Sequence, residues 1–411
     1  MKKLIGPFSQ IVTMRRMPLK GSLKDEKLEI VKDGGIVVKD GCIKAVGDMN
    51  SLSRLHHGAT LENIDRPAVL LPGFIDCHTH LCFSGTRSSD YAMRISGKSY
   101  LEIAKSGGGI WNTVESVRNT SEAELMGLLL QRIKQHVAAG ITTIEVKSGY
   151  GLNIDCELRL LRAIKMAGVA SEADIISTCL AAHIKPKDFK GEDKNYLQHI
   201  IKELLPVIKE KELCRRVDIF IEETAFCQHE ASKFLMAAGL LGFNSTVHAD
   251  QFTPGSSLVA IAAGAHSADH LEASTDIEIN ALADSNTVAV VLPGASFGLG
   301  LPYAPARKIL NAGACLAIAS DWNPGSAPHG DLLMQAAIMG AAEKLNTAET
   351  FAALTYRAAH ALRLNDRGII DKGNEAQMQA YPTADYRDIL YYQGTMKPFK
   401  VWTKEMPMSE V

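Results

Sequence analysis

From about Ala68 onward, short apolar runs alternate with segments of helical composition. One such segment, Ser121–Ala139, is rich in Glu, Leu and Ala and opens with a Ser-x-x-Glu capping box at Ser121 and Glu124. Strands that alternate with helices form parallel sheets, because each helix returns the chain to the same edge of the sheet. Eight such strands predict an α/β fold, a (β/α)8 TIM-like barrel. The predicted strands are Ala68–Ile75, Thr142–Val146, Ile175–Leu180, Val217–Ile221, Asn244–Val247, His266–Ala268, Val288–Leu292 and Cys315–Ala319.

Both ends of the chain have a different pattern. Two β-rich runs at 35–47 flank Asp40-Gly41, and an Asp-Gly pair in this setting predicts a hairpin turn. After about Leu362 the helical signal fades, and 368–370 and 399–402 are candidates for returning strands, whereas Gln377, Gln379 and Tyr381-Pro382 make a poor strand pattern. We therefore expect a barrel at residues 67–363 and a small β-sandwich-like domain composed of residues 1–66 and 364–411.

Charge and cysteine usage restrict the partners and the compartment. Lys plus Arg number 44 and Asp plus Glu 46, a net charge of −2. This balance argues against nucleic acid or an anionic membrane surface as the main partner, since both reward a basic face. The eight cysteines are scattered without a CxxC pair, which predicts reduced thiols. Gly6, Pro7, Ser9 and Gln10 interrupt the apolar start before it reaches signal-peptide length, and no run is long enough to span a membrane. We expect a soluble, cytoplasmic protein.

Polar residues gather where the predicted strands end. His78 and His80 follow the apolar run that begins at Leu70, and residues at i and i+2 of an extended strand point the same way. The later strands end in further candidates: His183, His248, His270 and Asp321. A barrel carries its chemistry at the carboxyl ends of its strands, so these side chains are expected to converge.

Taken together, three imidazoles and a carboxylate suit one divalent ion, Zn²⁺ or Fe²⁺, with a position left for water. Such an ion supplies hydroxide near neutral pH and polarises a carbonyl, while Asp321 can pass the water proton to a leaving nitrogen. The expected reaction is hydrolysis at an amide-like carbon. A lone histidine beside a strand is more often structural, and His56, His57 and His136 are expected to be solvated. Cys77 alternates to the opposite strand face and is expected to pack.

Over most of the chain, from about Leu71 to Gly368, these residues resemble the amidohydrolase superfamily and, within it, the imidazolonepropionase family. The superfamily signature is a strand-end His-x-His followed by His, His and Asp. The narrower motifs, in order, are Ser106-Gly107-Gly108-Gly109-Ile110, Lys147-Ser148-Gly149-Tyr150-Gly151-Leu152, Ala182-His183, His248-Ala249-Asp250-Gln251, Leu292-Pro293-Gly294 and Asp321-Trp322-Asn323-Pro324-Gly325-Ser326.

The resemblance implies hydrolysis of 4-imidazolone-5-propanoate to N-formimidoyl-L-glutamate, a step of histidine degradation. It implies a metal held by His78, His80, His248 and Asp321, with Asp321 and His270 as catalytic residues. Arg87 would hold the substrate carboxylate, as a guanidinium can by a bidentate pair. The other residues implied in substrate binding are Tyr150, His183, Gln251, Asn323, Gly325 and Ser326.

Two positions, Gln251 and Lys147, distinguish the implied one-metal hydrolase from related enzymes of the superfamily. Related deaminases carry a glutamate where this chain has Gln251, which cannot ionise and so weighs against a purine or pyrimidine aminohydrolase. Lys147 ends the second predicted strand, whereas metal-bridging lysines of the superfamily sit on the fourth, so one metal is expected. Other mononuclear cyclic amidohydrolases and a catalytically silent scaffold are the remaining alternatives. The expected partner is a small anionic substrate; a homodimer is common for such barrels, and the sequence leaves it open.

Overall fold

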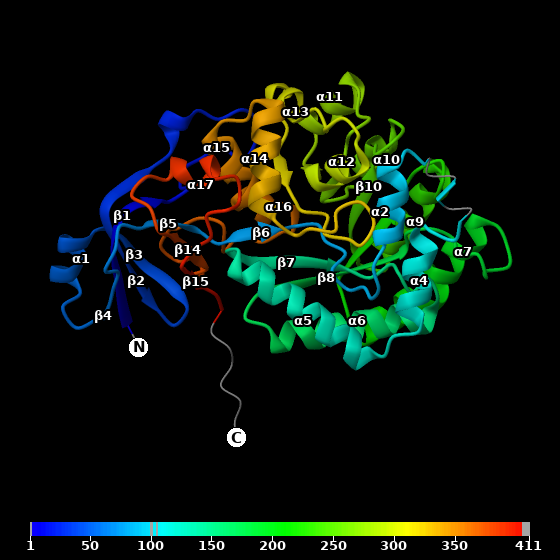
Figure 1. The fold of residues 1–411 in the computed structure, drawn as a ribbon, viewed down its shortest axis with the longest axis horizontal. Helices are drawn as coiled ribbons and strands as arrows, with labels where there is room; N and C mark the ends of the chain where they lie inside the picture. The colour runs from blue at the N-terminus through cyan, green and yellow to red at the C-terminus, as the bar shows by residue number, and fades with distance from the viewer. Residues whose placement is uncertain (1, 99–101, 104–105, 405–411) are drawn as a thin grey trace.

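The computed structural model describes residues 2–98, 102–103 and 106–404, and contains two sheets side by side (Figure 1). The larger has eight parallel strands in chain order, each hydrogen-bonded to the next, with helices around them. This is the predicted (β/α)8 barrel. Its strands are β6 (Phe74–Asp76), β7 (Ile141–Lys147), β8 (Asp174–Ala182), β9 (Arg216–Phe220), β10 (Asn244–Ala249), β11 (Ser267–His270), β12 (Val288–Val291) and β13 (Leu316–Ile318).

Helices connect and cover these strands. The predicted helix at 121–139 is α5 (Glu122–Ala138), and Ser121 caps it by accepting a hydrogen bond from the Glu124 N–H. Among the described residues, no helix combines the length and apolar character needed to cross a membrane. The other helices are α1 (Met49–Leu55), α2 (Ser88–Ile95), α4 (Ile110–Arg118), α6 (Ile154–Ala170), α7 (Asp193–His199), α8 (Leu205–Glu210), α9 (Gln228–Leu240), α10 (Ser256–Ala262), α11 (Asp276–Asp284), α12 (Pro293–Leu299), α13 (Ala306–Ala312), α14 (Leu332–Glu343), α15 (Thr347–Leu354), α16 (Tyr356–Ala361) and α17 (Arg387–Tyr391), with single turns at Asp25–Lys27 and Ile200–Leu204.

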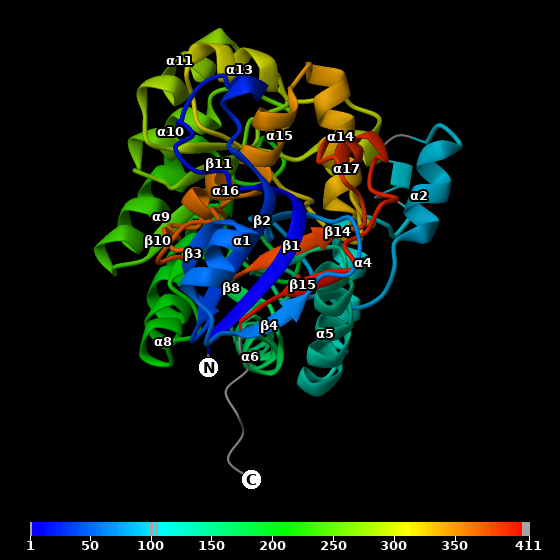
Figure 2. The same cartoon turned by 90° about the vertical axis from the view of Figure 1, so that its left-hand side faces the viewer.

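The second sheet is built from both chain ends, as expected. It is one mixed sheet of seven strands: β1 (Lys2–Val12), β2 (Ile30–Lys39), β3 (Cys42–Asp48), β4 (Thr60–Asn63), β5 (Val69–Pro72), β14 (Met378–Tyr381) and β15 (Lys400–Trp402). In Figure 2 the C-terminal strands lie beside the N-terminal ones. Asp40 and Gly41 join β2 to β3 with φ of 52° and 69°, the left-handed backbone that a type I′ turn requires.

The predicted strand Ala68–Ile75 is in fact two strands, because the backbone changes partners at Gly73. The Gly73 N–H donates to Gln377 O in the small sheet, whereas the Phe74 N–H donates to Gly140 O beside β7. β5 therefore pairs with β1 and β14, and only β6 enters the barrel. The chain passes from one sheet to the other within a single residue. The limits at residues 67 and 363 stay a prediction.

The C-terminal strands were only half predicted. β15 lies at the expected 399–402, but residues 368–370 form no strand, and the glutamine segment with the poor strand pattern forms β14 instead. Buried Gln379 satisfies its own amide: its Nε2 donates to Pro72 O at 3.0 Å, and its Oε1 accepts from the Tyr381 hydroxyl at 2.9 Å. A polar side chain is tolerated in a buried strand when it is hydrogen-bonded in this way, and that pairing cannot be read from local sequence.

Candidate metal centre and active site

Four of the predicted site residues meet where the barrel closes. His78, His80 and His248 are buried, and each offers a ring nitrogen within 4.8 Å of the others. Asp321 Oδ1 lies 3.7 Å from His78 Nε2 and 3.4 Å from His80 Nε2. His248 Nε2 lies 3.2 Å from His80 Nε2. Residues separated by more than 240 positions in the chain thus form one cluster, as the strand-end argument predicts.

This donor set fits a metal ion. Two nitrogens bound tetrahedrally at about 2.0–2.1 Å from zinc lie roughly 3.3 Å apart, close to the observed 3.2 Å between His80 and His248. The buried His78 Nε2 has no hydrogen-bond partner among the described residues, which is costly unless another ligand takes it. Three imidazoles and one carboxylate are the ligands that zinc and ferrous iron accept.

Two buried carboxylates orient the cluster's imidazoles. His78 Nδ1–H faces Asp269 Oδ2 at 2.6 Å, and His248 Nδ1–H faces Asp218 Oδ2 at 2.9 Å. Each carboxylate leaves the opposite ring nitrogen free for a ligand, as in most metal sites. Neither aspartate was among the residues predicted from the sequence. Their signal was a charged residue inside an apolar strand, as in Val217-Asp218-Ile219.

Lys147, the last residue of β7, is a buried ammonium group. Its Nζ lies 2.8 Å from Glu145 Oε1 and 2.8 Å from Asp218 Oδ2, and all three residues are fully buried. Burial opposes the Lys147 charge, but Asp218 and Glu145 outweigh it and raise the lysine pKa. The amine is thus committed to two carboxylates.

Burial sets the protonation of the cluster. Desolvation lowers the pKa of His248 to about 4, despite Asp218, and holds the pKa of His78 and His80 well below the usual range. Neutral imidazoles are the form that binds metals. Desolvation raises the pKa of Asp321 to about 7, against the opposing effect of nearby His270.

His270 joins the cluster from the end of β11. Its ring centroid is 5.3 Å from that of His248, and its Nδ1 lies 3.5 Å from Glu272 Oε2. Burial disfavours the imidazolium, but Glu272 and Asp321 outweigh burial and raise the His270 pKa. The His270 imidazole, which can carry a positive charge, therefore lies beside the four candidate ligands.

Arg87 lies at the loop that follows the last barrel strand. A Cβ at Gly325 would lie 2.3 Å from Arg87 Nη1, so the guanidinium fills the space that a side chain there would occupy. Arg87 Nε donates to Asp90 Oδ2 at 2.8 Å, and the Gly109 N–H donates to the same oxygen at 2.8 Å. The Gly-rich loop thus shapes the site by holding Asp90, which in turn orients Arg87.

Asn323 organises the 323–326 turn next to Arg87. Its Oδ1 accepts from the N–H groups of Gly325 (2.7 Å) and Ser326 (2.8 Å). Its Nδ2 donates to Asp321 O at 2.7 Å and to Ser326 Oγ at 2.9 Å. The three predicted residues of this turn therefore lie together and connect Arg87 to the Asp321 backbone.

The remaining predicted residues line the same strand ends. Tyr150 is buried, with its ring 5.9 Å from His80 and 5.6 Å from His183. His183 donates from Nδ1 to Gly149 O at 3.0 Å, and burial lowers its pKa to about 3. Gln251 follows β10, half-buried, and in the described part of the chain its side chain joins no hydrogen bond. Only its neighbours are fixed, since Phe252 and Thr253 donate their N–H groups to Glu222.

Two other side chains can now be placed. Cys77 is buried in a small apolar cluster, as expected, and all eight cysteines are free. The expectation that His136 is solvated is wrong: its side chain is 1% exposed. His136 faces inward from the last turn of α5. The local sequence does not distinguish it from the other polar residues of this helix, which is why its burial was not predicted.

The family profile that describes the amidohydrolases matches residues 69–404. A solved structure with the same fold is an adenosine deaminase from Xanthomonas campestris with bound zinc, at a TM-score of 0.69 and 18% identity, covering 98% of this chain and 91% of that one. The chain belongs to the amidohydrolase family and has a barrel of eight parallel strands.

Relatives of higher sequence identity identify a narrower family within the amidohydrolases. Imidazolonepropionase from Fusobacterium nucleatum is 39% identical over 391 residues, 94% of each chain. Imidazolonepropionase from Myxococcus xanthus is 39% identical over 367 residues, 88% of this chain and 87% of that one. Within the amidohydrolases, this chain belongs to the imidazolonepropionases.

Proposed function

We propose that this protein hydrolyses 4-imidazolone-5-propanoate to N-formimidoyl-L-glutamate. The observation that carries the proposal is the pairing of two features at one barrel end: a His–His–His–Asp cluster that fits a metal, and Arg87 held against the adjoining turn. The first suits hydrolysis of a ring amide, and the second suits a substrate with a carboxylate tail. The relatives named imidazolonepropionase support this combination.

The residues that would hold the metal are His78, His80, His248 and Asp321. We propose one divalent ion, zinc or iron, since both accept these ligands. When bound, it would lower the pKa of a coordinated water and polarise the substrate carbonyl. Asp269 and Asp218 contribute by keeping His78 and His248 in the tautomer and orientation that binding requires.

Substrate binding falls to residues around Arg87. Its guanidinium would form a bidentate pair with the propionate, and Asp90 keeps it in place. Tyr150 and His183, whose rings contact the cluster side of the site, would face the imidazolone ring. Gln251 and the 323–326 turn, with Asn323, Gly325 and Ser326, would complete the enclosure. A neutral His183 donates its one N–H to Gly149 O, so its Nε2 would accept a hydrogen bond from the ring without adding charge.

Asp321 would move the proton. Water adds to the ring carbonyl carbon, the bond from that carbon to the ring nitrogen breaks, and the carbonyl carbon becomes a carboxylate. Asp321 would accept the water proton and deliver it to the departing nitrogen, the two transfers of a general base and general acid. His270, whose pKa is raised by Glu272, would donate toward the oxygen that gains negative charge.

The direct test supplies the unstable substrate from urocanate with urocanase and follows N-formimidoyl-L-glutamate by mass spectrometry. We expect product far above the spontaneous rate, loss of activity on chelation, and recovery with zinc or ferrous iron, which also ranks the two metals. A metal-loaded protein that gives no acceleration would refute the substrate. Ammonia release from purines or pyrimidines would then favour the aminohydrolase alternative.

A further inference from the structure

Two buried polar residues near the site have no part in the proposed mechanism. Asp76 is the last residue of β6, and His136 is in the last turn of α5; their side chains are 0% and 1% exposed. His136 Nε2 lies 3.2 Å from Asp76 Oδ2, and neither atom has another hydrogen-bond partner among the described residues. Burying such a pair is costly unless its contacts stabilise the surrounding structure.

The pair lies at the seam where the barrel closes. The ladder runs from β6 to β13, and the first and last strands are three residues each. Beyond their ends the closure continues through two backbone hydrogen bonds, from Asp321 N–H to His78 O and from His80 N–H to Trp322 O, both 3.0 Å. These bonds involve three of the four candidate metal ligands.

Asp76 adds a third bond to this seam. Its Oδ1 accepts from the Ser320 N–H at 3.0 Å, one residue before Asp321, while its Oδ2 faces His136. His136 also packs edge-on against Trp322, one residue after Asp321, with ring centroids 5.0 Å apart. Asp321 therefore has a contact on each side: Asp76 accepts a hydrogen bond from Ser320, and His136 packs against Trp322.

We propose that Asp76 and His136 are positioning residues that set the metal affinity by holding the 320–322 segment against β6. The inference rests on the ligand set in the proposed function. Asp321 has a φ of 50°, an unfavourable backbone for a residue with a side chain. Such a conformation persists only when its surroundings impose it, and the flanking contacts from Asp76 and His136 do so.

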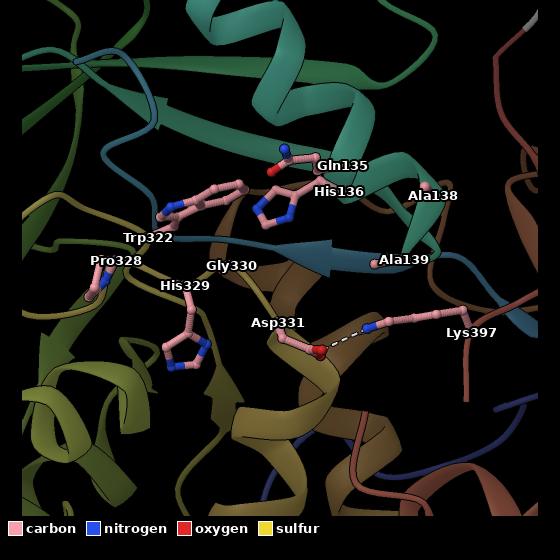
Figure 3. A pocket seen from close by; sticks show the side chains of 10 residues that line it. All are labelled: Gln135, His136, Ala138, Ala139, Trp322, Pro328, His329, Gly330, Asp331 and Lys397. Carbon is pink, nitrogen blue, oxygen red and sulfur yellow. Dashed lines mark hydrogen bonds and ion pairs between the residues drawn. The ribbon is translucent and has the colours of Figure 1, made fainter. Parts of the chain in front are cut away.

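A cavity makes the proposal testable by chemical rescue. His136 and Trp322 line a cavity of about 380 Å³. Figure 3 shows these side chains together with His329 and the Asp331–Lys397 ion pair. Removing the His136 side chain would join its space to this cavity. Free imidazole could then enter and replace the missing ring beside Asp76.

The experiment measures metal affinity by competition with a chromophoric chelator, beside turnover and urea unfolding. We expect Asp76→Ala and His136→Ala to bind zinc at least roughly 10-fold more weakly, in the range seen when groups that support metal ligands are lost. Asp76→Asn keeps an acceptor for Ser320 N–H and should recover most of the affinity. Imidazole should restore His136→Ala but not Asp76→Ala; the wild type with imidazole corrects for binding to the metal itself.

The matched control is Thr287→Val. Thr287 is buried, and its hydroxyl donates to Ala265 O at 2.9 Å before β12 begins, at the opposite end of the barrel. It should lose stability and keep zinc affinity within about two-fold. If Asp76→Ala and His136→Ala fold and bind zinc like the wild type, or if Thr287→Val weakens zinc equally, the positioning role is refuted. Zinc affinity is measured without substrate. The test of Asp76 and His136 therefore stays valid even if the protein does not hydrolyse the proposed substrate.

Discussion

At the scale of single residues, the site is built on unusual backbone and paired charges. Asp321 and His270 both have positive φ, 50° and 91°, at the ends of barrel strands. Strained backbone of this kind gathers at functional sites because the surrounding structure imposes it. The carboxylates of Asp218 and Asp269 fix the imidazoles they contact. Single substitutions here should therefore affect chemistry more than folding.

Replacing Asp321 with Asn should separate proton transfer from metal binding. The amide keeps an oxygen toward His80 but cannot accept a proton, so we expect kcat to fall roughly 1,000-fold while part of the metal is retained. Product formation and metal content of the same sample would be measured. Near-normal turnover by the variant would contradict the role given to Asp321.

Replacing Arg87 with Lys should raise KM for the substrate. Lysine keeps the charge but lacks the planar fork that binds a carboxylate at two points, so we expect about a 10-fold or larger rise in KM with a smaller change in kcat. Arg162→Lys, at an ion pair with Glu122 on the outer helices, serves as the control and should leave KM unchanged. A KM equal to the wild-type value would remove Arg87 from carboxylate binding.

At the scale of elements, the loop that carries Tyr150 is tied to the helix after it. Glu157, on α6, is fully buried. Its carboxylate accepts backbone N–H groups from Gly149 (3.1 Å), Gly151 (2.8 Å) and Leu152 (2.8 Å). Desolvation raises the pKa of Glu157, and these hydrogen bonds oppose that rise. One helical side chain thus fixes the loop on both sides of Tyr150.

Replacing Glu157 with Gln should loosen this loop. The glutamine NH2 group would face an N–H donor that is buried, which we expect to cost about 1–3 kcal/mol in the free energy of unfolding, together with a higher KM. Urea unfolding and steady-state kinetics would measure the two effects. Glu230→Gln, an exposed pair with Lys233 on α9, should change neither. An unchanged KM in Glu157→Gln would show that the loop needs no such support.

At the scale of the whole molecule, the candidate metal ligands and the partly buried ring of His266 lie at opposite ends of the barrel. The metal cluster lies at the carboxyl ends of the strands, whereas His266 precedes β11 at the amino end. Burial lowers the His266 pKa to about 4, aided by the nearby charges of Arg216 and Arg363, with His360 also acting to lower it. This histidine can therefore report on stability without touching the site.

The His266 shift predicts acid sensitivity of folding. Between its ordinary pKa of 6.5 and the folded value of about 4, the unfolded chain binds more protons at this position than the folded chain. Stability from His266 is thus complete above 6.5, declines as the pH falls toward 4, and is constant below. Since the His266 side chain is partly exposed, we expect a loss on the order of 1 kcal/mol.

Urea unfolding of the wild type and His266→Gln at several pH values would isolate this contribution. The difference between their free energies of unfolding should change between pH 6.5 and 4 and stay level above pH 7. Parallel curves for the two proteins over the whole range would contradict the assignment.

Much of the fold was predictable because its signals are local. Seven of the eight barrel strands lie where their apolar runs predicted them, and the Asp40-Gly41 turn has the expected backbone. The candidate ligands His78, His80, His248 and Asp321 converge because parallel strands present their carboxyl ends at one edge. The errors arose where partners are distant: β5 and β6 were merged, and Gln379 was taken as part of a poor strand pattern.

The sequence by itself determined the barrel, the ligand types and their strand-end positions, because periodicity and apolar runs act over a few residues. Only the tertiary structure decided which carboxylates orient which imidazoles, which backbone is strained, and that His136 is buried against Asp76. These outcomes depend on contacts between segments far apart in the chain. The physical reason is that a buried polar group is stable only with a partner, and packing alone decides which partner lies within reach.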